Sequence, residues 1–198
     1  MTIFNRQRLT NDVFKIDVKR MRRGWYSDKY FENIGVMLSS LAEQGYLFKG
    51  DALSLAGVDL SNTEVGNLEV EMQWFTRRTG KVVVAGVDKA LTMLRHCSGY
   101  FNDDGKFINT WNRLEVEAVH DGDNVTFEGD PASIQPVIRV RGRYRDFALL
   151  ETPTLGLLTR SSRVATNVYE TLKSARGKPV LFFPARFDLH EVQAADGY

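Results

Sequence analysis

The sequence predicts an α+β / α/β fold, in which an N-terminal α/β domain with antiparallel strands precedes the first strand and helices of an irregular α/β barrel. Two observations carry this prediction. Strand-like runs separated by short turns fill residues 67–142 around a single helical segment. After them come a helical stretch, a continuous apolar run and a polar loop, which is the order of elements in one unit of an α/β barrel.

The composition is that of a soluble globular protein. The chain has 198 residues, of which 43% are hydrophobic and 26% charged, and its net charge of +1 favours neither nucleic acid nor membrane as a partner. It contains no apolar run of the roughly 18 to 20 residues that a membrane span requires, and its first residues lack the apolar core of a signal peptide. We therefore expect a cytoplasmic protein. The single cysteine, Cys97, excludes an internal disulfide and is interpreted as a small buried hydrophobe.

A basic arm, "KIDVKRMRRGWYSDKY", precedes the first predicted helix. Ser27 is interpreted as the N-cap of that helix, with Asp28 in its first turn, and Gly45 as its end. Apolar residues at helical spacing predict the buried stripe of this helix, namely Tyr30, Ile34, Met37, Leu38 and Leu41.

Five runs read as antiparallel strands, and the segment "VDKALTMLRHC" at 87–97 reads as the helix between them. The runs are "NLEVEMQWFTR", "KVVVAG", "RLEVEAVH", "NVTFEG" and "IQPVIRVRG". The segment "HDGDNVTFEGD" at 120–130 has the Asp-Gly and Glu-Gly-Asp sequences of hairpin turns. Its carboxylates, Asp121, Asp123, Glu128 and Asp130, fit turn chemistry better than a cation loop.

The C-terminal region begins near Tyr144. Residues 144–177 are helical in composition, with an interruption expected at Pro153 and a core stripe of Val164, Val168 and Leu172. The run "KPVLFF" at 178–183 predicts a strand buried on both faces, and Arg186 lies on the polar loop after it. In α/β barrels such loops carry the functional site.

From about Trp25 to the last residue, the chain resembles the type II phosphoribosyltransferases, specifically nicotinate phosphoribosyltransferase and its nicotinamide-using relatives. The resemblance rests on "YSDKYF", "VEMQWFTRRTGKVVVAGVDKAL", "DGDNVTFEGD", "LLETPTLGLLTRSSRVATN" and "FFPARFDLHEVQAADGY" in this order. Two of these segments are also similar to the stretch of quinolinate phosphoribosyltransferase where the N-terminal half-barrel passes into the catalytic barrel. The resemblance implies an N-terminal α/β domain over 1–145, with basic arm and half-barrel strands, and an incomplete barrel domain over 146–198.

The resemblance also implies a reaction. The family joins a pyridine carboxylate or carboxamide to phosphoribosyl pyrophosphate in NAD biosynthesis, and the nicotinate enzymes couple this transfer to ATP hydrolysis with Mg²⁺. Phe183 matches the aromatic residue that stacks on the pyridine, and Arg186 the arginine that reaches its carboxyl group. Tyr30 matches a tyrosine that covers the other face of the ring from the partner subunit, so a homodimer is expected.

Each of these residues has a simpler interpretation from the sequence. Phe183 and Tyr30 could be core residues, and Arg186 could cap a helix or pair with Asp188 or Glu191. His190 is interpreted as structural or supporting, because the histidine that is phosphorylated in the family lies further along than this chain extends.

Two basic clusters are candidates for phosphate binding. Arg22 and Arg23 of the arm could face solvent, bind substrate phosphates of a neighbouring subunit, or contact nucleic acid. Arg139, Arg141 and Arg143 alternate along one strand and so share a face, where they could line a phosphate path or face water. Of these, Arg22, Arg23 and Arg141 are the possible phosphate ligands.

The length of the chain differs from that of the family. A full barrel takes roughly 200 residues, whereas 53 remain from Asp146 to Tyr198. We therefore expect this chain to be the N-terminal portion of an enzyme and inactive alone, with the catalytic residues, phosphate loops and magnesium ligands beyond Tyr198. No metal ligand is assigned within it. The alternatives are a nicotinamide- or quinolinate-type enzyme, a nucleic-acid protein, or a carrier-like binding module, for which the turn "EGDPAS" offers no lysine.

Overall fold

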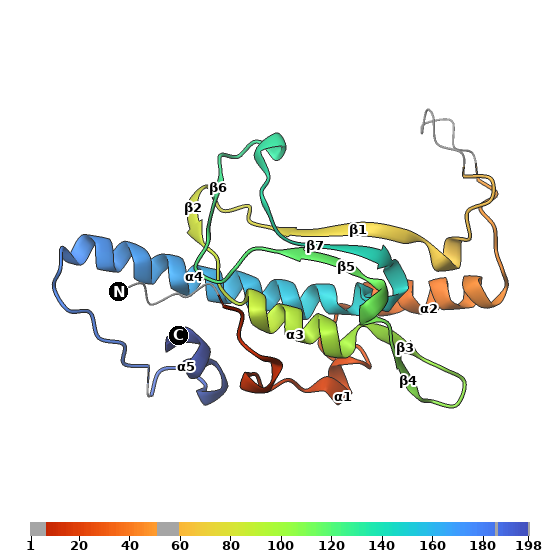
Figure 1. Cartoon of the computed structure of the whole chain (residues 1–198), viewed down its shortest axis with the longest axis horizontal. Helices are drawn as coiled ribbons and strands as arrows, with labels where there is room; N and C mark the ends of the chain where they lie inside the picture. The colour runs from red at the N-terminus through yellow and green to blue at the C-terminus, as the bar shows by residue number, and fades with distance from the viewer. Residues whose placement is uncertain (1–6, 51–59, 185, 198) are drawn as a thin grey trace.

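The structure is a computed structural model that describes residues 7–50, 60–184 and 186–197. Helices and antiparallel strands are mixed within it (Figure 1), which confirms the predicted α+β class. The α-helices are α1 (Val18–Met21), α2 (Lys29–Glu43), α3 (Val87–Cys97), α4 (Glu151–Ala175) and α5 (His190–Gly197). The strands are β1 (Glu69–Phe75), β2 (Gly80–Val83), β3 (Gly99–Phe101), β4 (Phe107–Asn109), β5 (Glu115–Ala118), β6 (Asn124–Phe127) and β7 (Pro136–Arg143).

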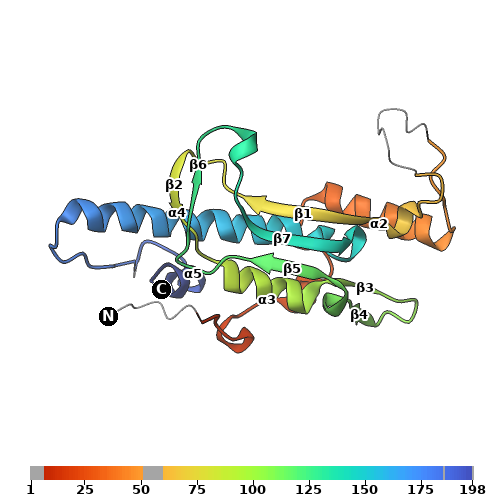
Figure 2. The ribbon, with the colours of Figure 1, turned by 45° about the horizontal axis from the view of Figure 1, so that its top comes forward.

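A three-stranded antiparallel sheet in the order β1-β7-β5 forms the centre of the molecule (Figure 2). Its two faces differ because side chains alternate along each strand. Met72 is paired with Val140, and Trp74 with Ile138, on the inner face. On the outer face Glu71 is opposite Arg141, and Glu117 is opposite Arg139. One face is therefore apolar and the other carries alternating charges.

Helices α3 and α4 run along the apolar face of this sheet (Figures 1 and 2). Trp74 is 2% exposed, and its indole Nε1–H donates to Thr154 Oγ1 of α4 at 2.9 Å. The carboxylate of Asp121 accepts from the backbone N–H groups of Val87 and Asp88 and so caps α3 from a distant turn. Cys97 at the end of α3 is buried as predicted, and burial raises the pKa of its thiol to about 11.

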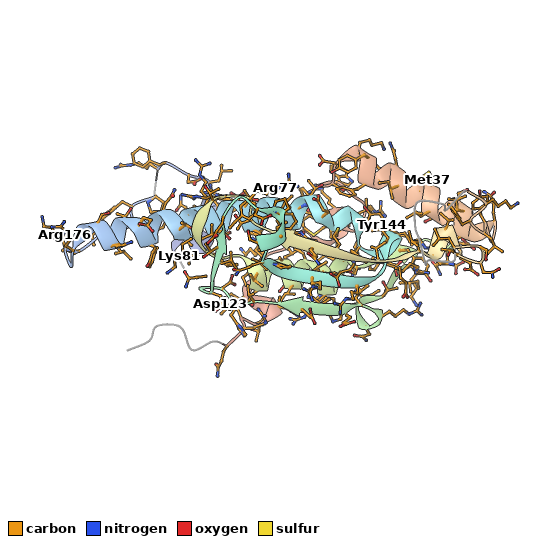
Figure 3. All side chains as sticks on the ribbon, turned by 90° about the horizontal axis from the view of Figure 1, so that it is seen from above. Met37, Arg77, Lys81, Asp123, Tyr144 and Arg176 are labelled. Atoms are coloured by element: carbon orange, nitrogen blue, oxygen red, sulfur yellow. The ribbon has the colours of Figure 1, made fainter. Side chains whose placement is uncertain are left out.

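The smaller elements surround this core. β2 pairs with β6, and β3 pairs with β4, both antiparallel. Helix α2 packs against the short 3₁₀ turn η2 (Val65–Asn67), where Gly66 is buried against the α2 backbone. Met37 of α2 and Arg176, directly after α4, lie at opposite ends of the molecule (Figure 3).

The first predicted helix is present, but two of its details were wrong. Its N-cap is Asp28, one residue after Ser27, and the chain leaves it through Gly45 with φ of 57°. Phe31 and Leu38 are its buried residues, whereas Tyr30 and Met37 are 53% and 55% exposed. Helical spacing is found in two sets of residues, one at 30, 34, 37 and 41 and the other at 31 and 38. Periodicity therefore did not reveal which face of the helix packs against η2.

All five predicted strands and the helix at 87–97 are present, but the predicted hairpin at 120–130 is wrong. Gly122 and Gly129 have the positive φ expected of turns, 87° and 89°. However, β6 pairs with β2, and β5 pairs with β7, so the strands next to the turn do not pair with each other. The hairpin β3–β4 was not predicted, although Asp-Gly at its tip was a signal for it.

Three predictions for the C-terminal region are also wrong. Pro153 does not interrupt the helix, because it lies in the first turn of α4. Backbone N–H groups in the first turn have no acceptor within the helix, so the N–H that proline lacks costs no hydrogen bond. The residues that α4 buries are Thr154, Leu158 and Thr166, while Val168 and Leu172 are 40% and 51% exposed. Residues 178–183 form no strand, since no described strand pairs with them to satisfy their backbone groups.

The hydrophobic core continues across the domain boundary predicted at residue 145. Phe147, Leu150 and Leu158 belong to the same buried cluster as Trp74 and Val140. The division into 1–145 and 146–198 stays a prediction. No helix within the described ranges combines the length and apolar character needed to cross a bilayer.

Candidate functional site

A pocket of about 740 Å³ lies between the start of α2 and one face of α4. α4 contributes most of its wall because residues three and four apart share a helix face. The lining residues are Asp28, Tyr30, Glu151, Thr152, Leu155, Gly156, Thr159, Arg160, Arg163, Val164 and Asn167. The pocket therefore has carboxylates at one end of this helix face and arginines further along it.

The acidic end brings two carboxylates near one hydroxyl. Thr152 Oγ1 lies 3.3 Å from an oxygen of Asp28 and 3.3 Å from an oxygen of Glu151. Burial raises the pKa of Glu151, and the negative charge of Asp28 raises it further. The hydrogen bond from Thr152 opposes this rise. Desolvation and the charges of Glu151 and Asp28 likewise raise the pKa of Tyr30. The Tyr30 phenol therefore stays protonated and can donate a hydrogen bond to a ligand.

The basic end contains Arg160 and Arg163. Arg160 Nη2 donates to Asp188 at 2.5 Å and to Asp196 at 2.6 Å. The bond to Asp188 and the charge of Asp196 raise the pKa of Arg160. Arg163 is exposed and forms no ion pair with any residue in the described ranges. An anionic ligand group can therefore find a guanidinium here.

Phe183 and Arg186 lie outside this pocket. Neither is among its lining residues, and Phe183 is 75% exposed. Several further apolar side chains of the same segment are also exposed, among them Leu181, Phe182, Phe187 and Leu189. Within one chain the structure thus brings Tyr30 together with α4 but not with Phe183 or Arg186.

The simpler interpretations of these residues can be compared with the geometry. Tyr30 and Phe183 are both mostly exposed, so neither is a core residue in this chain. Arg186 is exposed and forms an ion pair with neither Asp188 nor Glu191. Asp188 contacts Arg160 instead, and Glu191 lies 3.3 Å from His190. His190 is itself exposed, next to that carboxylate. The roles assigned to Tyr30, Phe183 and Arg186 stay predictions.

Two of the three possible phosphate ligands, Arg22 and Arg23, lie beside the β3–β4 hairpin, whereas Arg141 lies on the outer face of the sheet. Arg22 Nε donates to the His96 carbonyl at 2.9 Å, and its guanidinium lies 4.0 Å from the Phe107 ring centroid. Arg23 is exposed beside Phe101. Arg141, on the outer face of the sheet, forms ion pairs with Glu71 and Glu115. Arg22 and Arg141 therefore each have a structural role, and the three residues form no common cluster.

Sequence reasoning did not single out Glu151, Thr152, Arg160, Arg163 or Asn167 as site residues. All five lie in the segment "LLETPTLGLLTRSSRVATN", on one face of a helix. The spacing 152, 156, 159, 163, 167 is a polar or small stripe at helical period, and that signal could have revealed them. The prediction instead looked for the apolar stripe of the same helix.

Comparison with known proteins gives a match over most of the described core. The family model of the quinolinate phosphoribosyl transferase N-terminal domain matches residues 58–162, which is more than half of the chain. A search of curated protein sequences finds no match.

Two solved structures share the fold. Nicotinate-nucleotide pyrophosphorylase from Pyrococcus furiosus is 18% identical, with a TM-score of 0.57, and the match covers 99% of this chain and 39% of that chain. Human nicotinic acid phosphoribosyltransferase is also 18% identical, with a TM-score of 0.54, and the match covers 85% of this chain and 33% of that chain. The chain therefore spans less than half the length of either protein.

Proposed function

The chain belongs to the family of quinolinate phosphoribosyl transferase N-terminal domains, and from this premise we propose that it serves an enzyme that makes a pyridine nucleotide from phosphoribosyl pyrophosphate. The family match over 58–162 is the observation that carries this proposal. At family level the chain is a type II phosphoribosyltransferase N-terminal domain of the quinolinate and nicotinate kind. The complete enzyme, with a barrel domain and two protomers, is part of the proposal.

Nicotinate is the proposed pyridine substrate. A flat ring with one carboxylate requires an aromatic face and a guanidinium. Phe183 and Arg186, both exposed, supply these groups from one short segment, and Tyr30 supplies a second aromatic ring whose phenol stays protonated. In a dimer, Tyr30 of one protomer faces Phe183 of its partner across the bound ring.

The chemistry proposed for this domain is binding and orientation. Pyridine nitrogen attacks the anomeric carbon of phosphoribosyl pyrophosphate, a C–N bond forms, and pyrophosphate leaves with its electron pair. Arg186 holds the carboxylate at the far end of the ring, so that the nitrogen points toward the anomeric carbon. The reaction is a group transfer, and aligning the two substrates is the main contribution of such contacts.

ATP and Mg²⁺ are implied for nicotinate enzymes only by the family resemblance. Among the side chains that the structure describes, no three His, Cys, Asp or Glu residues gather in a way that could hold a metal ion. Mg²⁺ therefore stays a proposal for the complete enzyme, and no step proposed for this domain passes through the ion.

Quinolinate is the second candidate substrate, and the description of the matching family favours it. It carries two adjacent carboxylates and therefore calls for more than one cation. Arg186 is one, and Arg160 and Arg163 are further guanidiniums on the chain. Nicotinamide, which has no carboxylate, would leave Arg186 without a charged partner.

The test is a substrate comparison with the complete protein that contains this domain. Phosphoribosyl pyrophosphate is supplied with nicotinate, quinolinate or nicotinamide, each with and without ATP and Mg²⁺, and pyrophosphate and nucleotide are quantified by chromatography and mass spectrometry. We expect nicotinate mononucleotide from nicotinate, faster with ATP. Turnover of quinolinate alone assigns the second candidate. Pyrophosphate release from none of the three contradicts the proposed function.

A further inference from the structure

Arg160 lies where the pocket and the C-terminal segment meet. It lines the pocket from α4, and its Nη2 contacts Asp188 and Asp196 at 2.5 and 2.6 Å. We call this three-residue contact the Arg160 bridge. A single guanidinium nitrogen thus joins a wall of the pocket to two carboxylates that follow the turn bearing Arg186 in sequence.

The Arg160 bridge holds α5 at both ends. Asp188 precedes the helix, where one of its oxygens accepts from Leu189 N–H at 2.9 Å and its backbone carbonyl accepts from Gln193. Asp196 lies in the last turn of α5, and its side chain is only 9% exposed. Both ends of α5 are therefore connected to the same nitrogen of α4.

The turn that carries Arg186 lies beside this anchored helix. Phe187 N–H donates to the Pro184 carbonyl at 2.6 Å and closes the turn. The Phe182 ring lies against the end of α5, 3.2 Å from where a Cβ on Gly197 would stand. The segment that contains the turn is therefore connected to α5 through Phe182 on its N-terminal side, and to Arg160 of α4 through Asp188 on its C-terminal side.

We propose that Arg160 is a positioning residue, which fixes the turn bearing Arg186, and Phe183 directly before it, relative to the α4 wall of the pocket. This inference rests on the proposed function, because it takes Phe183 and Arg186 as the contacts to the pyridine carboxylate. In this role Arg160 acts through the carboxylates of Asp188 and Asp196. Its loss leaves both ligand-contacting side chains present but no longer held.

The Asp196 carboxylate is 9% exposed, whereas Arg160 and Asp188 are 44% and 38% exposed, so the Arg160 bridge is only partly shielded from solvent. Exposed pairs are screened by solvent and contribute little. Removal of one partner from a shielded pair leaves the other charge unmatched, which is the larger effect. Arg160→Gln therefore leaves the shielded Asp196 carboxylate without its cation and should loosen α5 by a modest amount, since the other two groups are screened by solvent.

The first test measures the Arg160 bridge without any ligand. Amide hydrogen exchange of α5 is compared in the wild type, Arg160→Gln, Asp196→Asn and the double variant, with Lys173→Gln as control for the loss of a cation on the same helix. We expect the α5 amides to exchange about fivefold faster in Arg160→Gln and less than that in Asp196→Asn, which keeps the Asp188 pair, with the double variant no faster than Arg160→Gln. Unchanged exchange, or additive increases, overturns the bridge.

The second test separates positioning from simple stabilisation. Because one Nη2 contacts both carboxylates, a lysine ammonium with three donors can replace it, so Arg160→Lys should restore most of the protection. In the complete protein, Arg160→Gln should raise KM for nicotinate about fivefold at an unchanged Tm, with KM for phosphoribosyl pyrophosphate unchanged. An equal change in both KM values overturns the positioning role. Absence of turnover in the wild type contradicts the proposed function. In that case the amide hydrogen exchange of α5 still shows whether the Arg160 bridge forms.

Discussion

At the scale of single residues, one buried hydrogen bond joins the sheet to α4. Thr154 accepts from the Trp74 indole and donates to the Leu150 carbonyl, and both side chains are buried. Thr154→Val keeps the shape but leaves the indole N–H without an acceptor, which should lower the free energy of unfolding by about 1–3 kcal/mol. Urea denaturation followed by tryptophan fluorescence measures this. Thr171→Val, an exposed threonine of the same helix, is the control. Equal stability of both variants would show that the Trp74 contact is dispensable.

The raised pKa of Asp121 predicts the sign of a pH dependence of stability. Burial raises the pKa of its carboxyl above the usual 3.8, with N–H bonds from α3 opposing the rise. The folded protein therefore holds this proton more tightly than the unfolded chain does. Its contribution to stability is full below the unfolded pKa and is lost as pH rises through the folded value. The stability difference between wild type and Asp121→Asn should accordingly fall with rising pH.

The measurement is the free energy of unfolding of wild type, Asp121→Asn and the exposed turn variant Asp103→Asn from roughly pH 3.5 to 7. Asp103→Asn should follow the wild type throughout. A wild-type advantage over Asp121→Asn that grows with pH has the opposite sign and rejects this assignment.

Some residue positions could be predicted from the sequence, and their partners could not. Alternation along 139–143 correctly placed Arg139 and Arg141 on one face of a strand. The carboxylates opposite these arginines come from the strands on either side, Glu71 from β1 and Glu115 and Glu117 from β5. Their positions depend on the pairing of strands that lie far apart in sequence. A row of arginines was therefore visible, but its neutralisation by cross-strand carboxylates was not.

At the scale of elements, two glycines near α2 predict opposite effects of the same substitution. A Cβ on Gly66 would lie 2.1 Å from the Ala42 backbone nitrogen, whereas a Cβ on Gly35 meets nothing within 4 Å. Gly66→Ala forces η2 away from α2 and should destabilise the protein by about 3 kcal/mol. Gly35→Ala, inside the helix, should stabilise it by about 0.5–1 kcal/mol. Chemical denaturation of the two variants measures both changes. Equal signs would contradict the close packing of η2 on α2.

Local signals were sufficient for elements that depend on local interactions. The helix at 87–97 and the five strands between 67 and 142 were predicted, because their periodicity and turn residues lie within each segment. Elements that depend on distant partners were missed. The run at 178–183 has the composition of a buried strand, but no described strand pairs with it. The pocket was missed because its wall is the polar face of α4, and it forms only when α2 packs nearby.

At the scale of the whole molecule, the proposed site requires two protomers. Tyr30 lines the pocket between α2 and α4, while Phe183 lies outside it, and both side chains are exposed. A symmetric dimer would give two equivalent sites. We therefore predict that the complete protein is a dimer whose activity falls on dilution below its dissociation constant. Sedimentation velocity, run at the assay concentration, measures the association. A monomer whose specific activity is independent of dilution would exclude a shared site.

The central claim is that Arg186 binds the carboxylate of a pyridine whose ring stacks on Phe183, and its most direct test is a nicotinate titration. A charge-assisted hydrogen bond contributes about 1.5–3 kcal/mol, so Arg186→Ala in the complete protein should weaken nicotinate binding by roughly 10- to 150-fold. Affinity for phosphoribosyl pyrophosphate should stay unchanged, and Arg186→Lys should restore little, because an ammonium lacks the planar two-point geometry. Wild-type affinity for nicotinate in folded Arg186→Ala, or equal loss of both substrates, would contradict the claim.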